Sequence, residues 1–181
     1  MTAAKEPSQR PFSGCVDKVN EAYHFLLLMR VAELPEEAET VPGRLQGEDA
    51  FRFAFSAFLS AARTVLYLLQ EDGVSIPGFT RWYVTARERW LRDDISTFFG
   101  ERRHFRITFP SGEASVALAP NTLEHPRVDP LGAAELPDIQ TSGHDGAAAF
   151  RERPAESATE LCAQYLERLS ALVSQAQHLA A

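Results

Sequence analysis

The sequence predicts an all-α fold: an up-and-down bundle of about five helices, with a small β-hairpin and a loop-rich insertion before the last helix. Three observations support this prediction. Two long segments, near 48–72 and 155–179, carry apolar side chains at helical spacing. Prolines and glycines gather between helical segments, most strongly between residues 120 and 150. The 181 residues fit one domain with a substantial core.

The first half of the chain predicts a leader followed by two helices. Residues 1–12 are expected to be a disordered leader. A helix is expected near 14–33, with Ser13 as its cap and Asp17 in its first turn. The stretch LPEEAETVPGRLQG predicts a loop, and a second helix follows near 48–72. The second helix has a continuous apolar stripe, formed by Phe51, Phe55, Phe58, Ala62, Val65 and Leu69.

The middle of the chain predicts two shorter helices and a hairpin. A third helix near 79–91 has Trp82 and Trp90 among its apolar anchors, for which packing is favoured over stacking on nucleobases. Asp93 or Asp94 is expected to cap a fourth helix that ends around Phe105. The alternating residues of ITFPSGEASVALAP, around an SGE turn, predict a small hairpin.

The end of the chain predicts an insertion and a last helix. Residues 120–150 are too long and too rich in proline for a simple connection, so a functional flap or a mobile insertion is expected there. The helix near 155–179 has an apolar stripe of its own. Residues 13–181 are therefore expected to form a single domain, with the loop-rich insertion at about 107–152.

The cysteines and the apolar runs predict a cytoplasmic protein. Cys15 and Cys162 lie far apart, without CxxC spacing, so we expect reduced, packed thiols. We expect no signal peptide, since the first residues are polar. The apolar run FAFSAFLSAARTVLYLL contains Arg63, which is costly in lipid without a partner, and this favours a buried core helix over a membrane span.

The charge is uneven along the chain. A net charge of −7 argues against a protein that coats nucleic acid or an acidic membrane non-specifically. Arginines are nevertheless concentrated in one region, so any anion-binding face is expected there. They are Arg81, Arg87, Arg89, Arg92, Arg102, Arg103 and Arg106.

Four segments together resemble the HEPN superfamily of small helical bundles. They are AFLSAARTVLYLLQ (57–70), PGFTRWY (77–83), DDISTFFGERRHF (93–105) and ERPAESATELCAQYLERLSALV (152–173). The resemblance implies a helical bundle from a bacterial toxin–antitoxin or defence system. It also implies a homodimer with the region of Arg103 near the two-fold axis. Active members of this superfamily cleave RNA without a metal, using an Arg and a His that are separated by four to six intervening residues.

The motif of the active members is broken in this chain. On the resemblance, Arg103 takes the Arg position, His104 takes the position that is often Asn, and Thr108 stands where His is expected. A Thr hydroxyl cannot act as a base near neutral pH, whereas His exchanges protons there. We therefore expect a domain that binds rather than cleaves, with Arg103, His104 and Thr108 as the candidates for any residual catalysis.

The candidate residues for binding an anion or RNA are Arg63, Arg102, Arg103 and Arg106. Their alternatives are structural. Arg102, Arg103 and Arg106 also suit the negative end of a helix, and so does His104. Arg63 could form a salt bridge between helices, to Asp94 or Glu101. No cofactor is expected, and no metal, because the residues of the insertion fit no ligand motif: His125, Asp129, Asp138, His144 and Asp145.

Three functions remain open from the sequence. The first is a non-catalytic HEPN-like domain that binds RNA, a nucleotide or a protein partner through the arginines. The second is a weak or atypical metal-independent ribonuclease. The third is a structural dimerisation module, in which the arginines only cap and solubilise helices. RNA binding through arginines should weaken steeply with salt. A purely structural module should show no RNA binding at all.

Overall fold

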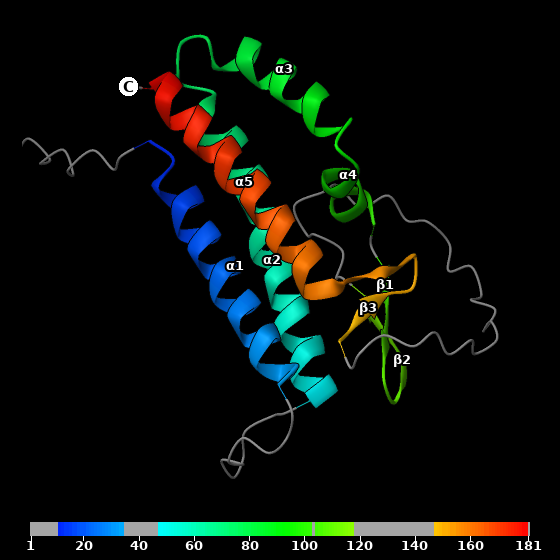
Figure 1. Cartoon of the computed structure of the whole chain (residues 1–181). Coiled ribbons are helices and arrows are strands. Elements are labelled where there is room, and N and C mark those ends of the chain that lie inside the picture. Colours follow the sequence, from blue (N-terminus) through cyan, green and yellow to red (C-terminus); the bar gives the residue numbers. More distant parts are fainter. Residues whose placement is uncertain (1–10, 35–46, 103, 118–146, 181) are drawn as a thin grey trace, which may run out of the picture.

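The computed structural model describes residues 11–34, 47–102, 104–117 and 147–180. This part of the chain is mostly helical, as predicted, with five helices and a small antiparallel sheet (Figure 1). The sheet has four strands, which is more than the predicted hairpin, so the all-α prediction is too narrow.

Three long helices form the body of the molecule: α1 (Ser13–Ala32), α2 (Gly47–Gly73) and α5 (Ala158–Ala180). They lie side by side, with α1 running opposite to α2 and α5 (Figure 1). The predicted apolar stripes form their shared core, and each large apolar side chain buried there contributes about 1.5–3 kcal/mol. Both cysteines lie in this core and are free thiols.

Helix α2 is the one described helix that is long and apolar enough to cross a membrane by length and composition. Such a helix is weak evidence of a membrane span, because a core helix of a folded domain has the same character. Phe55, Phe58 and Leu59 are fully buried inside the protein. The core therefore accounts for part of the apolar surface of α2, whereas Phe53 and Tyr67 of the same helix are exposed.

The start of α1 differs from the prediction. Ser13 is not the cap, because Phe12 takes the cap position with a left-handed backbone (φ 63°) and no side chain caps the helix. The ring of Phe12 is buried and lies 6.0 Å from the ring of Phe79. Burial of this ring favours a conformation that a non-glycine residue seldom adopts. The predicted leader thus includes a core residue, while residues 1–10 lie outside the described part.

Helix α3 (Phe79–Trp90) lies beside the half of α5 nearer the C-terminus (Figure 1). It packs through aromatic side chains, as predicted for its two tryptophans. Trp82 lies 5.4 Å from Phe79, and Trp90 lies 5.7 Å from Tyr165, between ring centroids. The outer side of α3 is exposed.

Helix α4 (Asp94–Glu101) begins as predicted and ends earlier. The Asp93 side chain caps it, accepting a hydrogen bond from the Ser96 amide at 2.8 Å. The predicted end near Phe105 is wrong, because Arg102 is already extended. Beyond it, buried Phe105, Ile107 and Phe109 alternate with polar residues, which is a strand pattern.

The sheet has the strand order β2-β1-β3-β4, and all its pairs are antiparallel. Strands β1 (His104–Phe109) and β2 (Gly112–Ala117) form the predicted hairpin. Strands β3 (Ala149–Phe150) and β4 (Arg153–Ser157) were not predicted, and β4 takes the first residues of the predicted last helix. Most of the predicted insertion, residues 118–146, lies outside the described residues.

Candidate functional site

Arg63 extends from the middle of α2 to the end of α4. Its Nη2 donates to the main-chain oxygen of Phe99 at 2.9 Å and to that of Arg102. The last carbonyls of a helix have no partner within it and carry its negative end, so a guanidinium there is favourable. Asp94, one predicted partner of Arg63, pairs instead with Arg153 at 2.8 Å. The side chain of Glu101, the other predicted partner of Arg63, lies outside the described residues. The structure thus gives Arg63 a capping role.

Arg102 is also engaged within the protein. Its Nη1 lies 2.6 Å from Glu152 Oε1, and its guanidinium stands 4.7 Å from the centre of the Phe98 ring. The main-chain oxygen of Arg102 also accepts a hydrogen bond from the Arg63 side chain. Arg103 lies outside the described residues. The predicted set is therefore not seen as one cluster of free cations.

Strand β1 places three candidate residues on one face. His104, Arg106 and Thr108 alternate with the buried residues of β1, so they share the side of the sheet away from the core. We call this side the outer sheet face. Opposite them on β2 lie Ala117, Ser115 and Glu113, in that order.

Among the described residues, the groups on the outer sheet face lack the spacing for acid–base catalysis. The carboxylate that β2 places there is Glu113, which stands opposite Thr108 and pairs with Arg151 at 3.6 Å. His104 is four residues further along β1, a separation of roughly 13 Å in a strand. A base and an acid acting at one phosphate must both be within hydrogen-bond reach of it. His104 and Glu113 therefore do not form such a pair.

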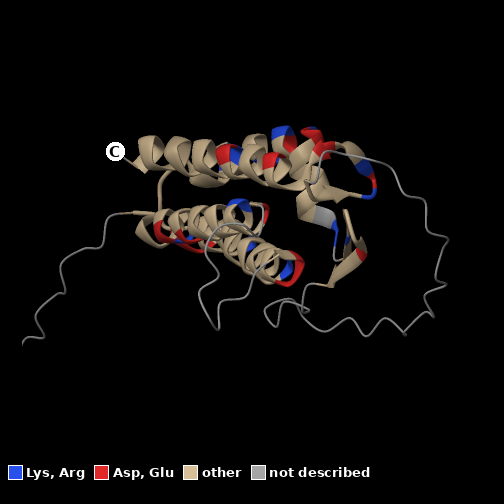
Figure 2. Cartoon of the chain, turned by 60° about the horizontal axis from the view of Figure 1, so that its bottom comes forward, with Lys and Arg blue, Asp and Glu red and all other residues tan. Residues whose placement is uncertain are grey.

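Within the described residues, the exposed side of α3 and the turn after it carry arginines whose side chains form no hydrogen bond or ion pair. Arg81, Arg87, Arg89 and Arg92 are exposed, and within the described residues none of their guanidinium groups forms a hydrogen bond or ion pair. Among the described arginines elsewhere, the exposed Arg30 and the half-buried Arg106 also form no side-chain hydrogen bond or ion pair within the described residues. The others are engaged: Arg52, Arg63, Arg102, Arg151, Arg153 and Arg168. Figure 2 shows basic and acidic positions interspersed along the helices and the sheet.

Three of these residues lie on the same side of the helix. Arg81, Arg89 and Arg92 follow each other at steps of eight and three residues, which keeps them within one quadrant of α3 and its C-terminal end. We call them the α3 arginine row. The one acidic residue of α3 is Glu88. Among the described residues, no salt bridge neutralises the charge of this row, which is therefore a positively charged surface.

A groove of about 300 Å³ lies beside the α3 arginine row. We call it the α3–α5 groove. Its lining combines two arginines, an indole, an amide and an apolar wall, provided by Ala86, Arg89, Trp90, Asp93, Ser96, Arg168, Ala171, Leu172 and Gln175. Two positive charges and one negative charge leave its lining with a net charge of +1.

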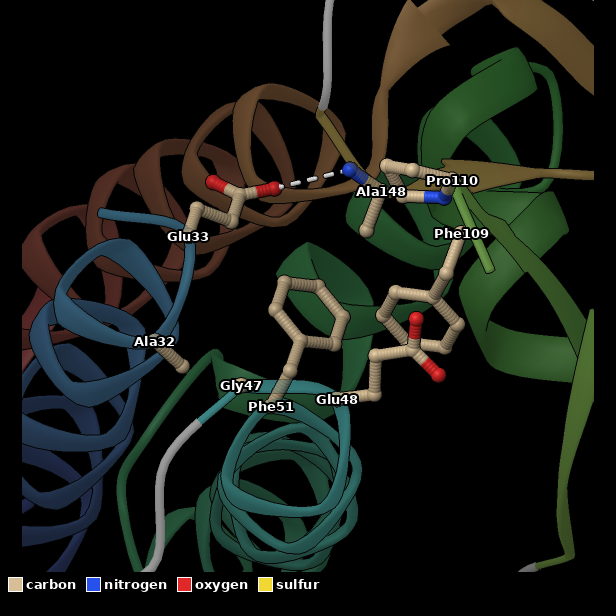
Figure 3. Close-up of a pocket in the computed structure, with 8 residues that line it drawn as sticks. All are labelled: Ala32, Glu33, Gly47, Glu48, Phe51, Phe109, Pro110 and Ala148. Atoms are coloured by element: carbon tan, nitrogen blue, oxygen red, sulfur yellow. Dashed lines mark hydrogen bonds between the residues drawn. The ribbon is translucent and has the colours of Figure 1, made fainter. Parts of the chain in front are cut away.

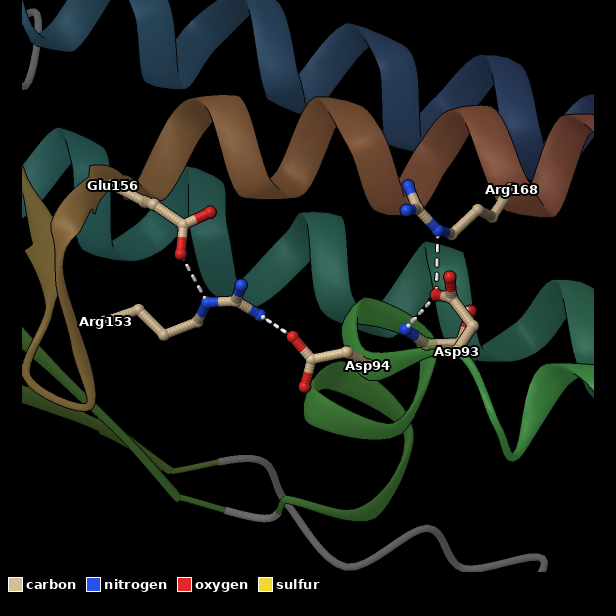
Figure 4. Close-up of polar contacts among 6 residues, drawn as sticks. Asp93, Asp94, Arg153, Glu156 and Arg168 are labelled. Atoms are coloured by element: carbon tan, nitrogen blue, oxygen red, sulfur yellow. Dashed lines mark hydrogen bonds and ion pairs between the residues drawn. The ribbon is translucent and has the colours of Figure 1, made fainter.

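The carboxylate of Asp93 is held in place at this groove. Arg168 Nε lies 2.7 Å from Asp93 Oδ1, which also accepts from the amide and hydroxyl of Ser96 (Figure 4). Burial raises the pKa of Asp93, but these hydrogen bonds outweigh burial and keep the pKa below its usual value. Nearby, Arg153 stands between Asp94 and Glu156 and ties α4 to β4 (Figure 4).

A second, smaller pocket has the opposite charge. It holds about 90 Å³ where α1 ends and α2 begins, next to the β1–β2 turn (Figure 3). Phe51 and Phe109 meet edge to face within it, and Glu33 and Glu48 provide carboxylates (Figure 3). Glu33 accepts hydrogen bonds from the Ala148 amide at 3.2 Å and from the Thr159 hydroxyl at 2.8 Å. This pocket therefore disfavours phosphate.

The chain matches no protein-family model, and no similar protein was found among curated proteins or among solved structures. The arginines of α3 were part of the predicted anion-binding region. Arg168 and Gln175 were missed. Arg168 is the single Lys or Arg of α5, beside its apolar stripe, and this isolation was the available signal.

Proposed function

We propose that this chain is a non-catalytic RNA-binding domain that holds the phosphate backbone with the α3 arginine row. The observation that carries the proposal is the contrast among arginines: those of α3 have no acidic partners within the described residues, whereas most others do. A bacterial toxin–antitoxin or defence setting, which the HEPN resemblance implies, remains part of the proposal.

Unpaired arginines support RNA binding on energetic grounds. An arginine already in a salt bridge has part of its charge compensated and some of its N–H donors in use, whereas an exposed arginine without a partner has its whole charge and all five donors available for a phosphate. Each phosphate that an arginine neutralises also releases a counterion. The net charge of −7 limits binding elsewhere on the surface and favours a local site.

Binding without cleavage is supported by the outer sheet face. A ribonuclease would need a proton donor and an acceptor at one phosphate. His104 and Glu113 are too far apart for this, and Thr108 cannot take a proton near neutral pH. The weak ribonuclease is therefore the less favoured alternative.

The proposal is tested by fluorescence anisotropy with labelled single-stranded RNA. We expect Arg89→Ala/Arg92→Ala to weaken binding by at least about tenfold, since each charged contact contributes about 1 kcal/mol or more. The matched controls are Arg151→Ala and Arg106→Ala, which remove arginines from the sheet. If the sheet variants lose binding and the α3 variant does not, the site has been misplaced. If the wild type binds no RNA, the proposal fails.

A second candidate is self-association through α1. Tyr23, Leu27 and Val31 are exposed and recur every four residues on the side of α1 away from the core. Exposed apolar rows of this kind favour contact with another chain. Light scattering should show a dimer for the wild type and a monomer for Leu27→Glu. A monomeric wild type at micromolar concentration would remove this candidate, including the homodimer implied by the resemblance.

A further inference from the structure

We propose that the α3–α5 groove seats one nucleoside phosphate unit, so that the bound RNA is single-stranded at this point. This inference rests on the proposed RNA binding and adds the kind of RNA and the place where one nucleotide is held. It comes from the groove itself, whose lining differs from that of the rest of the α3 surface.

Donors for a phosphate are available at the groove. Arg89 uses none of its guanidinium N–H groups within the described residues. Arg168 uses Nε for Asp93 and Nη1 for the main-chain oxygen of Gln164, which leaves Nη2 without a partner in the described part of the chain. A guanidinium presents five N–H donors in a planar fork that matches phosphate oxygens. Two guanidinium groups with unused N–H donors, those of Arg89 and Arg168, thus line the groove.

The Asp93 carboxylate is the one negatively charged group in the lining of the groove, and it would repel a bound phosphate. It is committed to Arg168 and to both donors of Ser96. Because its charge is already compensated, it repels a phosphate less than a free carboxylate would, and it holds the Arg168 side chain in place. The net charge of +1 over the lining leaves the groove attractive to an anion.

The remaining lining suits a nucleobase. Trp90, Leu172, Ala86 and Ala171 provide an aromatic and apolar wall, and Gln175 provides an amide with both donors and an acceptor. Proteins that recognise single-stranded RNA combine aromatic or apolar contact with hydrogen bonds to base edges. A volume of about 300 Å³ suits one nucleotide. A base paired in a duplex would not be free to enter it.

The test is a titration of the full chain with adenosine 5′-monophosphate, in which tryptophan fluorescence reports binding. The two tryptophans are Trp82 and Trp90, so Trp82→Phe leaves Trp90 as the reporter. We expect saturable quenching, weakened at least about tenfold by Arg89→Ala and by the groove-filling variant Ala171→Phe. Arg87→Ala is the matched control, because Arg87 is an exposed arginine of the same helix outside both the groove lining and the α3 arginine row. It should leave nucleotide binding unchanged.

The outcomes separate this inference from the proposed function. If RNA binding depends on the α3 arginine row but the nucleotide does not bind, the groove inference is overturned and the proposed function stands. Equal weakening by Arg87→Ala and Ala171→Phe also overturns it, since binding is then general attraction. If an acidic peptide such as oligo-glutamate binds in the groove and the nucleotide does not, the occupant is a protein segment and the inference is wrong.

Discussion

Arg63 Nη2 donates a hydrogen bond of 2.9 Å to the main-chain oxygen of Phe99, across 36 residues of sequence. An arginine in the apolar core helix α2 thereby compensates the negative end of α4. The sequence alone left two roles open for Arg63, a ligand contact or an interhelical contact. The contact with Phe99 favours the second role.

Removal of the Arg63 guanidinium should destabilise the fold. We expect Arg63→Met to lower the free energy of unfolding by about 1.5–3 kcal/mol, because the carbonyl groups at the end of α4 lose a charged donor. Arg52→Met is the matched control on the same helix. Its pair with Asp49 is exposed, so a decrease of less than about 0.5 kcal/mol is expected there. Urea denaturation measures both variants, and equal decreases would contradict the capping role.

Gly73 should tolerate no side chain. A Cβ at Gly73 would lie 2.2 Å from the ring of Phe79, which itself packs on Phe12, Trp82 and Tyr83. We expect Gly73→Ala to destabilise the protein by about 1–3 kcal/mol through overpacking. Gly100→Ala is the control.

At Gly100 the nearest atom to an added Cβ is Trp90 Nε1, at 4.0 Å. Alanine is also the better helix former, so this variant should be neutral or up to about 1 kcal/mol more stable. Thermal unfolding followed by circular dichroism distinguishes the two glycines. A stable Gly73→Ala would show that Phe79 is free to move.

Glu33 should make stability depend on pH. Burial raises its pKa above the ordinary glutamate value, although hydrogen bonds from Thr159 and Ala148 and the charge of Arg30 oppose this. A raised pKa in the folded state means that the folded protein binds the proton more tightly than the unfolded chain does. The stability from Glu33 is therefore present below the ordinary glutamate pKa and is lost as pH rises through the raised value.

The variant Glu33→Gln removes this titration while keeping a similar shape. Relative to Glu33→Gln, the wild type should lose stability as pH rises from about 4 to about 7. Urea denaturation at several pH values measures the difference. A difference that is constant with pH, or that grows in favour of the wild type, would contradict the assignment.

Both cysteines should resist thiol reagents in the folded protein. Burial raises the pKa of Cys15 to about 12, with a further contribution from Asp72, and burial also raises the pKa of Cys162. Because the thiolate is the reactive form, we expect negligible reaction with DTNB at about pH 8 in the native state. In denaturant both thiols should react fully. Rapid labelling of the native protein would show that this part of the core opens.

Local signals explain what could be predicted from the sequence. The apolar stripes of α2 and α5 and the Asp93 cap depend on residues within one helix, so spacing and residue type reveal them. The β1–β2 hairpin likewise depends on a nearby turn. Arginine density between Arg81 and Arg106 indicated the region of the candidate site, although not which arginines are free.

The features that were missed depend on contacts distant in sequence. Strand β3 has two residues and is defined by pairing with β1 and β4, so no pattern of its own identifies it. Phe12 takes its left-handed conformation beside Phe79, from another helix. Arg168 joins the groove through Asp93, which lies much earlier in the chain. Such relationships follow from tertiary packing.

The salt dependence of RNA binding tests the central claim most directly. The equilibrium constant for single-stranded RNA is measured between about 50 and about 300 mM salt for wild type, Arg89→Ala/Arg92→Ala and the control Arg52→Ala. We predict steep weakening for wild type and control. The logarithmic slope of the α3 variant should be smaller by about 0.7 for each phosphate that it no longer neutralises. Uncleaved RNA is expected throughout. Identical slopes for all three proteins, or RNA cut by the wild type, would contradict the account.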